Sequence, residues 1–144
     1  MNDSFQRLIN ILRREDCSCV IQTADGTTIR CRQRGVRDLY RLLTTEPATL
    51  HGALIADKVV GKGAAALMVL GGVSEVYARV ISESALALLS DVGIVVDYGE
   101  LATYIINQAG TGQCPVEKLC ADCTTARECF PRIKKFVEKI LNQN

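Results

Sequence analysis

Hydrophobic and polar positions along the first third of the chain change period twice, which predicts a helix, a hairpin and a second helix. Apolar residues recur every three or four positions over residues 3–15 and 37–46, as in helices that cover a core with one face. Between them, residues 18–23 and 27–33 are short strands that flank Ala24-Asp25-Gly26, the strongest hairpin signal in the chain.

Strands alternate with helices in the remaining sequence. The pattern predicts strands at 52–57, 75–82, 94–101 and 103–108, and helices at 58–70, 82–93 and 131–144. Ser82 or Ser84 is a suitable N-cap and Gly93 a suitable stop for the helix at 82–93. Such alternation favours right-handed crossovers on a mainly parallel sheet, with the antiparallel hairpin at one edge.

The predicted fold class is therefore α/β, a three-layer α/β/α sandwich around a mixed sheet of about five strands. With 144 residues the chain is long enough for one domain with a real core and short for two. We expect a single domain over residues 1–144, which includes a cysteine-rich segment at 114–131 and a final helix at 131–142.

Composition limits the cellular compartment and the classes of partner that can be expected for this chain. The net charge of +1 gives no basic face for a nucleic-acid backbone, so no duplex nucleic-acid partner is expected. No apolar run approaches the roughly 18 residues of a membrane span, and the first residues lack a signal-peptide pattern. We expect a soluble, cytoplasmic protein without a membrane partner. In that compartment the 7 cysteines indicate free thiols, metal ligands or redox groups rather than disulfides.

The predicted helix at 58–70 begins with an unusual set of charges, Asp57, Lys58 and Lys62. Two lysines four residues apart share one face of a helix, and beside the free N–H groups of its first turn they would hold a phosphate or carboxylate. Asp57 would orient a lysine or act as a base. The alternative is that Asp57 caps the helix and both lysines extend into solvent.

Cys114-Pro115-Val116-Glu117 follows a glycine-rich loop and is expected to open a short helix. A cysteine at a helix N-terminus can be nucleophilic, and Glu117 could exchange protons. Glu117 could equally complete a capping box, which would make the motif structural.

Four cysteines near the end of the chain, Cys114, Cys120, Cys123 and Cys129, form the pattern C-x5-C-x2-C-x5-C. Four thiolates can hold zinc or an iron–sulfur cluster, and C-x2-C is a standard half-site. We expect a set of buried or reactive thiols without a cofactor, because cysteine is often a small core residue, and the zinc or iron–sulfur site is the alternative.

Several segments together resemble a known family: RGVRDLYRLL, ADKVVGKGAAALMVLGGVSEVYARVIS, ALALLSDVGIVVDYGEL and YIINQAGTGQCPVEKL. The family is an uncharacterised bacterial and archaeal one, a domain of unknown function, and DKVVGK and CPxE are its specific elements. The resemblance covers roughly residues 5–140 and implies a cytidine-deaminase-like fold with no settled activity.

Zinc deaminases carry His-x-Glu at the start of one core helix and Pro-Cys-x-x-Cys at the start of the next. This chain has Asp57-Lys58-Val59 at the first position and Ile81-Ser82-Glu83-Ser84 at the second, with no good zinc ligand at either. We therefore expect no hydrolytic zinc deaminase.

These observations lead to three hypotheses for the function. The first is a site for a small anionic, nucleotide-like molecule at the start of the 58–70 helix, with catalysis left open. The second is a metal- or redox-sensing module built on the C-terminal cysteines, and the third is a non-catalytic interaction protein. A homo-oligomer is expected in each case. The candidate catalytic residues are Asp57, Lys58, Cys114 and Glu117, and the candidate ligand-binding residues are Gly61, Lys62, Ser82 and Ser84.

Overall fold

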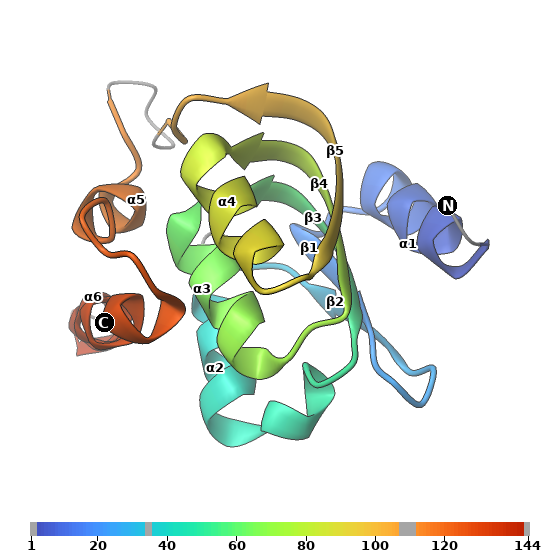
Figure 1. Cartoon of the computed structure of the whole chain (residues 1–144). Helices are drawn as coiled ribbons and strands as arrows, with labels where there is room; N and C mark the ends of the chain where they lie inside the picture. The colour runs from blue at the N-terminus through green and yellow to red at the C-terminus, as the bar shows by residue number, and fades with distance from the viewer. Residues whose placement is uncertain (1–2, 34–35, 107–111, 143–144) are drawn as a thin grey trace.

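The computed structural model describes residues 3–33, 36–106 and 112–142 (Figure 1). Its elements, in chain order, are α1 (Asp3–Arg14), β1 (Cys19–Gln22), β2 (Thr28–Cys31), α2 (Arg37–Thr45), a 3₁₀ turn (Pro47–Thr49), β3 (Leu54–Val60), α3 (Lys62–Gly71), β4 (Glu75–Ser82), α4 (Glu83–Asp91), β5 (Val95–Ala102), α5 (Pro115–Leu119) and α6 (Ala126–Asn142).

A five-stranded mixed sheet runs through the molecule in the order β2-β1-β3-β4-β5. β1 pairs antiparallel with both β2 and β3, whereas β3, β4 and β5 pair in parallel. The β1–β2 turn closes through the Thr23 N–H on the Thr27 carbonyl at 2.8 Å, and Gly26 supplies the positive φ of 95° that the turn needs. The predicted hairpin and mixed sheet are confirmed.

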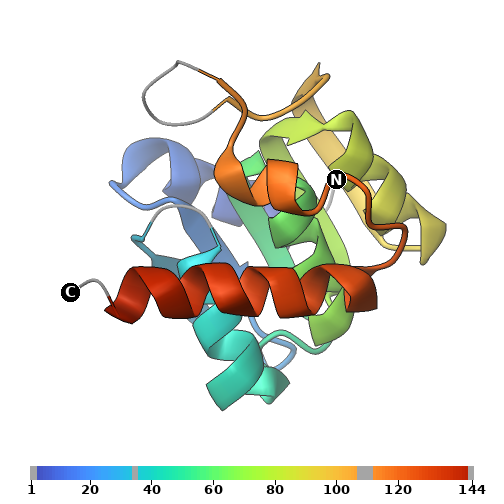
Figure 2. The ribbon, with the colours of Figure 1, turned by 90° about the vertical axis from the view of Figure 1, so that its left-hand side faces the viewer.

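Helices cover the two faces of the sheet unequally (Figure 1). α1 lies alone on one face, over β1 and β3, and α2, α3 and α4 lie on the other. α5 and α6 lie outside this second layer, where both pack against α3, and Figure 2 shows α6 crossing in front of it. The predicted three-layer α/β/α arrangement is confirmed, with α5 and α6 added on one side.

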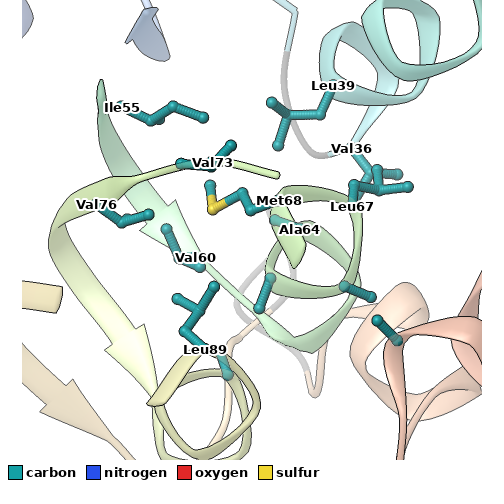
Figure 3. Close-up of a cluster of buried hydrophobic side chains, with 14 of the residues drawn as sticks. Val36, Leu39, Ile55, Val60, Ala64, Leu67, Met68, Val73, Val76 and Leu89 are labelled. Carbon is teal, nitrogen blue, oxygen red and sulfur yellow. The ribbon is translucent and has the colours of Figure 1, made fainter. Parts of the chain in front are cut away.

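The main core lies between the sheet and the α2–α4 layer (Figure 3). Ile55, Val60 and Val76 project from the sheet toward Leu67 and Met68 of α3. Because α3 has the sheet on one side and α6 on another, it is apolar almost all round, as a fully enclosed helix should be. A second, smaller cluster fills the space beneath α1.

The predicted boundary between strand and helix at residue 58 is wrong. β3 continues through Lys58 to Val60, and Val59 and Val60 pair with Val80 and Ile81 of β4. Two β-branched residues in succession favour a strand, and α3 begins only at Lys62, after Gly61 at the N-cap. Lys58 and Lys62 therefore do not share a helix face, and Asp57 does not cap α3.

Two further boundaries differ from the prediction. β5 ends at Ala102, and in the described part of 103–108 the only pairing is the isolated bridge of Ile106 with Gln113. Residues 107–111, with most of the glycine-rich loop, lie outside the described residues. The last helix begins at Ala126 rather than 131 and runs through Pro131. Its start is a Thr125-x-x-Glu128 cap, in which the Glu128 N–H donates to Thr125 Oγ1 at 3.2 Å.

The other predicted starts are confirmed. Ser82 caps α4 by accepting the Ala85 N–H at 3.2 Å, and Pro115 stands in the first turn of α5 after Cys114. Within the described ranges, no helix is both long and apolar enough to cross a membrane.

Candidate functional site

Most of the candidate polar residues lie in two separate groups of buried or partly buried side chains. The first, which we call the Glu117 cluster, contains Glu117, Lys62, Ser82 and Ser84 at the starts of α3 and α4. The second, the Asp57 row, contains Asp57, Cys19 and Cys31 across three strands of the sheet. Among the described residues, no hydrogen bond or ion pair joins Asp57 to Lys62 or to Glu117.

The Glu117 carboxylate, which is only 4% exposed, binds the first turns of two helices. Its Oε2 accepts the backbone N–H of Lys62 at 2.7 Å, and its Oε1 accepts the Ser84 hydroxyl at 3.3 Å. The Ser84 and Ser82 hydroxyl oxygens lie 3.3 Å apart, so the network continues to the cap of α4. A side chain from α5 thus connects α3 to α4.

The start of α3 explains why a carboxylate is stable in this buried position. The first N–H groups of a helix have no partner within it, and the N-cap of α3 is Gly61, which has no side chain to offer. Positive helix ends favour an anion, and a charged acceptor makes a stronger hydrogen bond than a neutral one. Glu117 therefore caps α3 from 55 residues further along the chain.

Lys62 is held by the turn between α5 and α6. Its side chain is buried, and its ammonium donates to the carbonyl of Ala121 at 3.2 Å and to that of Cys123. These carbonyls follow the end of α5, a position that favours a cation. The Lys62 side chain therefore fixes the α5–α6 turn over the start of α3 in this structure.

Two glycines leave the space that α5 occupies. A Cβ at Gly61 would overlap Glu117 Oε2, and a Cβ at Gly63 would overlap Cγ1 of Val116. The sequence Gly61-Lys62-Gly63 thus combines two small residues, which admit α5, with a cation that binds the following turn.

Three of the four C-terminal cysteines lie together beneath that turn. Cys120, Cys123 and Cys129 are all buried, and the Cys129 thiol is hydrogen-bonded to both others. The hydrogen bond from Cys129, aided by the charge of Lys62, lowers the pKa of the Cys120 thiol. Burial raises the pKa of Cys123, and the bond to Cys120 raises that of Cys129.

Cys114 lies at the start of α5 rather than in this thiol group. It is partly exposed, and its backbone N–H donates to the Ile105 carbonyl at 2.7 Å. Among the residues that the structure describes, no three or more His, Cys, Asp and Glu side chains are arranged to hold a metal ion. A zinc or iron–sulfur site at these cysteines stays a prediction.

The Asp57 row crosses the sheet on the face that α2 and α3 cover. Asp57 of β3 lies opposite Cys19 of β1, which lies opposite Cys31 of β2. Burial raises the pKa of Asp57 to about 7, although the Val59 N–H donates to its Oδ1 at 3.3 Å. The hydrogen bond with Cys31, together with burial, raises the pKa of Cys19 well above its usual range.

Lys58 belongs to neither group. As the next residue along β3 it points to the opposite face of the sheet from Asp57. There, burial raises the pKa of Cys17 and the Lys58 charge opposes that shift, which puts Lys58 near the α1 side. The expected pocket of Asp57, Lys58, Lys62, Cys114 and Glu117 is therefore divided in the structure.

The structure brings five candidate residues together, Gly61, Lys62, Ser82, Ser84 and Glu117. None of them supplies the imidazole or thiolate ligands of a zinc deaminase, so the starts of α3 and α4 do not fit that metal. The contact of Asp57 with Cys19 was not among the predictions from the sequence. A register of β1 against β3 would have revealed it, and the hairpin supplied only the register of β1 against β2.

Comparisons with known proteins give a family and a fold. The family described as "Domain of unknown function (DUF1893)" matches residues 7–137. A crystal structure of a DUF1893 family protein from Thermotoga maritima is similar to the whole chain, with a TM-score of 0.79 at 24% identity, and the match covers 92% of that protein. No curated protein matches the chain.

Proposed function

The chain belongs to the DUF1893 family, a domain of unknown function, and we propose that it binds a small anionic, nucleotide-like molecule at the Glu117 cluster. The observation that carries this proposal is the 2.7 Å hydrogen bond from the Lys62 N–H to the Glu117 carboxylate. The site already holds an anion in a buried position, and that anion is a side chain of the protein itself.

The donors around Glu117 are those that suit a phosphate or a carboxylate. A helix N-terminus supplies backbone N–H groups and a positive potential, and Ser84 supplies a hydroxyl. A ligand would take these donors when Glu117 and α5 move away from the start of α3. The same movement would release the Lys62 ammonium from the carbonyls of Ala121 and Cys123 and make it a further partner for the ligand.

The proposal is for binding, and the separation of the residues supports that limit. Asp57 and Lys58, the expected acid–base pair, lie on opposite faces of the sheet and outside this cluster. Among the described residues, Glu117 is the carboxylate that accepts hydrogen bonds from the starts of α3 and α4, and it acts here as the competitor of the incoming anion.

Thermal unfolding with added ligand tests this proposal. The probes are inorganic phosphate and nucleoside monophosphates, with the matching uncharged nucleosides as controls. A ligand that binds the native state raises the midpoint, and at about 100 times its Kd it adds roughly 2.7 kcal/mol of stability.

The informative variant is Glu117→Gln, which keeps the shape of the side chain but removes its charge. The amide oxygen can still accept the Lys62 N–H, so the fold should survive, and far-UV circular dichroism checks this. We expect phosphate and nucleotides to stabilise this variant more than the wild type. Glu138→Gln, at an exposed position on α6 outside the cluster, removes the same charge as a control and should respond as the wild type does. An equal or absent response in folded Glu117→Gln protein would contradict the proposal.

A second candidate function, a thiol-based redox module, is favoured by the contact among Cys120, Cys123 and Cys129. In the proposed reaction Cys120 and Cys129 form one S–S bond, and the two protons and two electrons they lose reduce an azo oxidant such as diamide to the hydrazine. The lowered pKa of Cys120 favours it as the attacking thiolate.

Mass spectrometry tests the redox candidate directly. Diamide should remove two hydrogens from the wild-type chain, and peptide mapping should join Cys120 to Cys129. Cys129→Ser should abolish that pair, whereas Cys17→Ser, at a buried thiol beneath α1, should leave it intact. A disulfide between other cysteines, or no disulfide in samples that contain only folded protein, would contradict this function.

A further inference from the structure

A groove lies between α2 and the C-terminal part of α6, away from the Glu117 cluster. Its volume is about 270 Å³, and its lining includes Arg37, Tyr40 and Arg41 of α2 and Val137 and Leu141 of α6. Figure 2 shows α6 passing across α2 at this place. The two arginines of the groove both come from α2.

Arg37 carries a buried donor that has no hydrogen-bond partner among the described residues. Within the described ranges, its Nε is the one buried side-chain nitrogen or oxygen that has no hydrogen bond. Leaving such a group unpaired destabilises the folded state, so an unpaired donor in a native structure calls for an explanation. Nε belongs to the planar fork with which arginine binds carboxylate and phosphate, and Arg37 lines the groove.

Arg41 places a second guanidinium on the same wall. Its contacts with acids are long, 3.5 Å to Asp38 and 3.6 Å to Glu46, and half of its side chain is exposed. Asp38 is mainly engaged by the Gln33 N–H, which donates to it at 3.0 Å. Arg41 is therefore free to turn toward an anion in the groove.

The apolar side chains of the groove come from both helices, Tyr40 from α2 and Val137 and Leu141 from α6. The Tyr40 ring stacks on Phe130, with ring centroids 5.9 Å apart, which holds the ring in place. Leu141 of α6, which is 54% exposed, and Val137 also line the groove. An aromatic or acyl group that covers these side chains would remove apolar surface from water.

We propose that this groove binds a small organic anion, whose carboxylate or phosphate takes the Arg41 guanidinium and that of Arg37, which turns so that its Nε reaches the anion, while the apolar part of the ligand covers Val137 and Leu141. The unpaired donor, the second cation and the exposed leucine each match one part of such a ligand. The site is independent of the proposed function at the Glu117 cluster, because it shares no residue with it.

Titration followed by NMR tests the proposal with phenyl phosphate and benzoate as probes. Both probes join an anionic group to a phenyl ring, so at least one of them should bind in the millimolar range and shift the methyl signals of Val137 and Leu141. Inorganic phosphate, which lacks the apolar part, should bind more weakly. A preference between phenyl phosphate and benzoate identifies the anionic group.

Variants distinguish the groove from general attraction of anions. Arg37→Met should weaken binding about tenfold or more, since hydrogen bonds to charged groups are the stronger kind. Arg41→Met should also weaken binding, and because Arg41 is exposed this variant should still fold. Arg13→Met, at an exposed position on α1, should leave binding unchanged. In the absence of ligand, Arg37→Met should be as stable as the wild type, because it removes an unpaired donor.

Two results would overturn the proposal. One is an absence of methyl shifts at Val137 and Leu141 at millimolar probe in the wild type. The other is equal affinity in the wild type and the folded Arg37→Met and Arg41→Met proteins.

Discussion

Replacing Asp57 by Asn should change how the stability of the protein depends on pH. Burial raises the pKa of Asp57 to about 7, whereas the same carboxyl in an unfolded chain titrates near 4. Asn has nearly the same shape, and its Oδ1 can still accept the Val59 N–H. The substitution therefore removes the ionisation of this side chain while keeping its main hydrogen bond.

The sign of the effect follows from proton binding. Below about pH 4 the carboxyl is protonated in both the folded and the unfolded chain, so ionisation costs nothing. Between about pH 4 and pH 7 the unfolded chain releases this proton first, so wild-type stability falls as the pH rises. Above about pH 7 both states are ionised and the loss levels off.

The magnitude follows from the size of the shift. About three pKa units at 1.36 kcal/mol each give a total penalty of about 4 kcal/mol at alkaline pH. Roughly 1–2 kcal/mol of it is already present at about pH 5, so the advantage of Asp57→Asn should grow by about 3 kcal/mol between about pH 5 and pH 8.

Urea denaturation followed by far-UV circular dichroism measures this difference, because the chain has no tryptophan to report unfolding by fluorescence. Asp16→Asn, at an exposed aspartate, is the matched control and should track the wild type. A free-energy difference between Asp57→Asn and wild type that is constant with pH, or that grows toward acid, would refute the reasoning.

Three further predictions concern the start of α3 and α4. Gly61→Ala should lower the free energy of unfolding by roughly 1–3 kcal/mol, because its Cβ would overlap Glu117 Oε2, whereas Gly112→Ala, which meets nothing, should change little. Ser82→Ala should cost about 1 kcal/mol by removing the cap of α4, and Ser90→Ala on the exposed side of the same helix should not; chemical denaturation measures all four. Lys62→Met should expose the α5–α6 turn to limited proteolysis, because it removes the ammonium that binds two carbonyls there; unchanged cleavage in this turn would show that Lys62 does not hold it.

Much of the fold could be predicted from local signals. Hydrophobic periodicity identified each helix on the sheet, and the Ala24-Asp25-Gly26 turn identified the hairpin. Ser82 and Pro115 marked helix starts correctly, because a cap depends on residues within one turn. The same reasoning placed the start of the helix too early, at residue 58. The small apolar residues after Gly61 do favour a helix, but β3 continues through Asp57 and Lys58 to Val60.

The candidate site was predicted in part. Glu117, Lys62, Ser82 and Ser84 do lie together, because the ends of neighbouring parallel strands bring the starts of α3 and α4 to one edge of the sheet. The role of Glu117 was among the alternatives, since a capping function was considered, but within its own helix. The structure instead places it at the start of α3.

Local signals in the sequence were enough to predict most of the order of the elements, the hairpin and the three-layer arrangement around a mixed sheet. These features depend on periodicity, turn residues and caps that act over a few positions. Only the tertiary structure decided that Asp57 lies beside Cys19 and that Glu117 takes the N–H of Lys62. Both contacts join residues tens of positions apart, and their free energy appears only when strand register and helix packing bring the groups together. For the same reason, the buried Nε of Arg37, which has no partner among the described residues, could be recognised only in the tertiary structure.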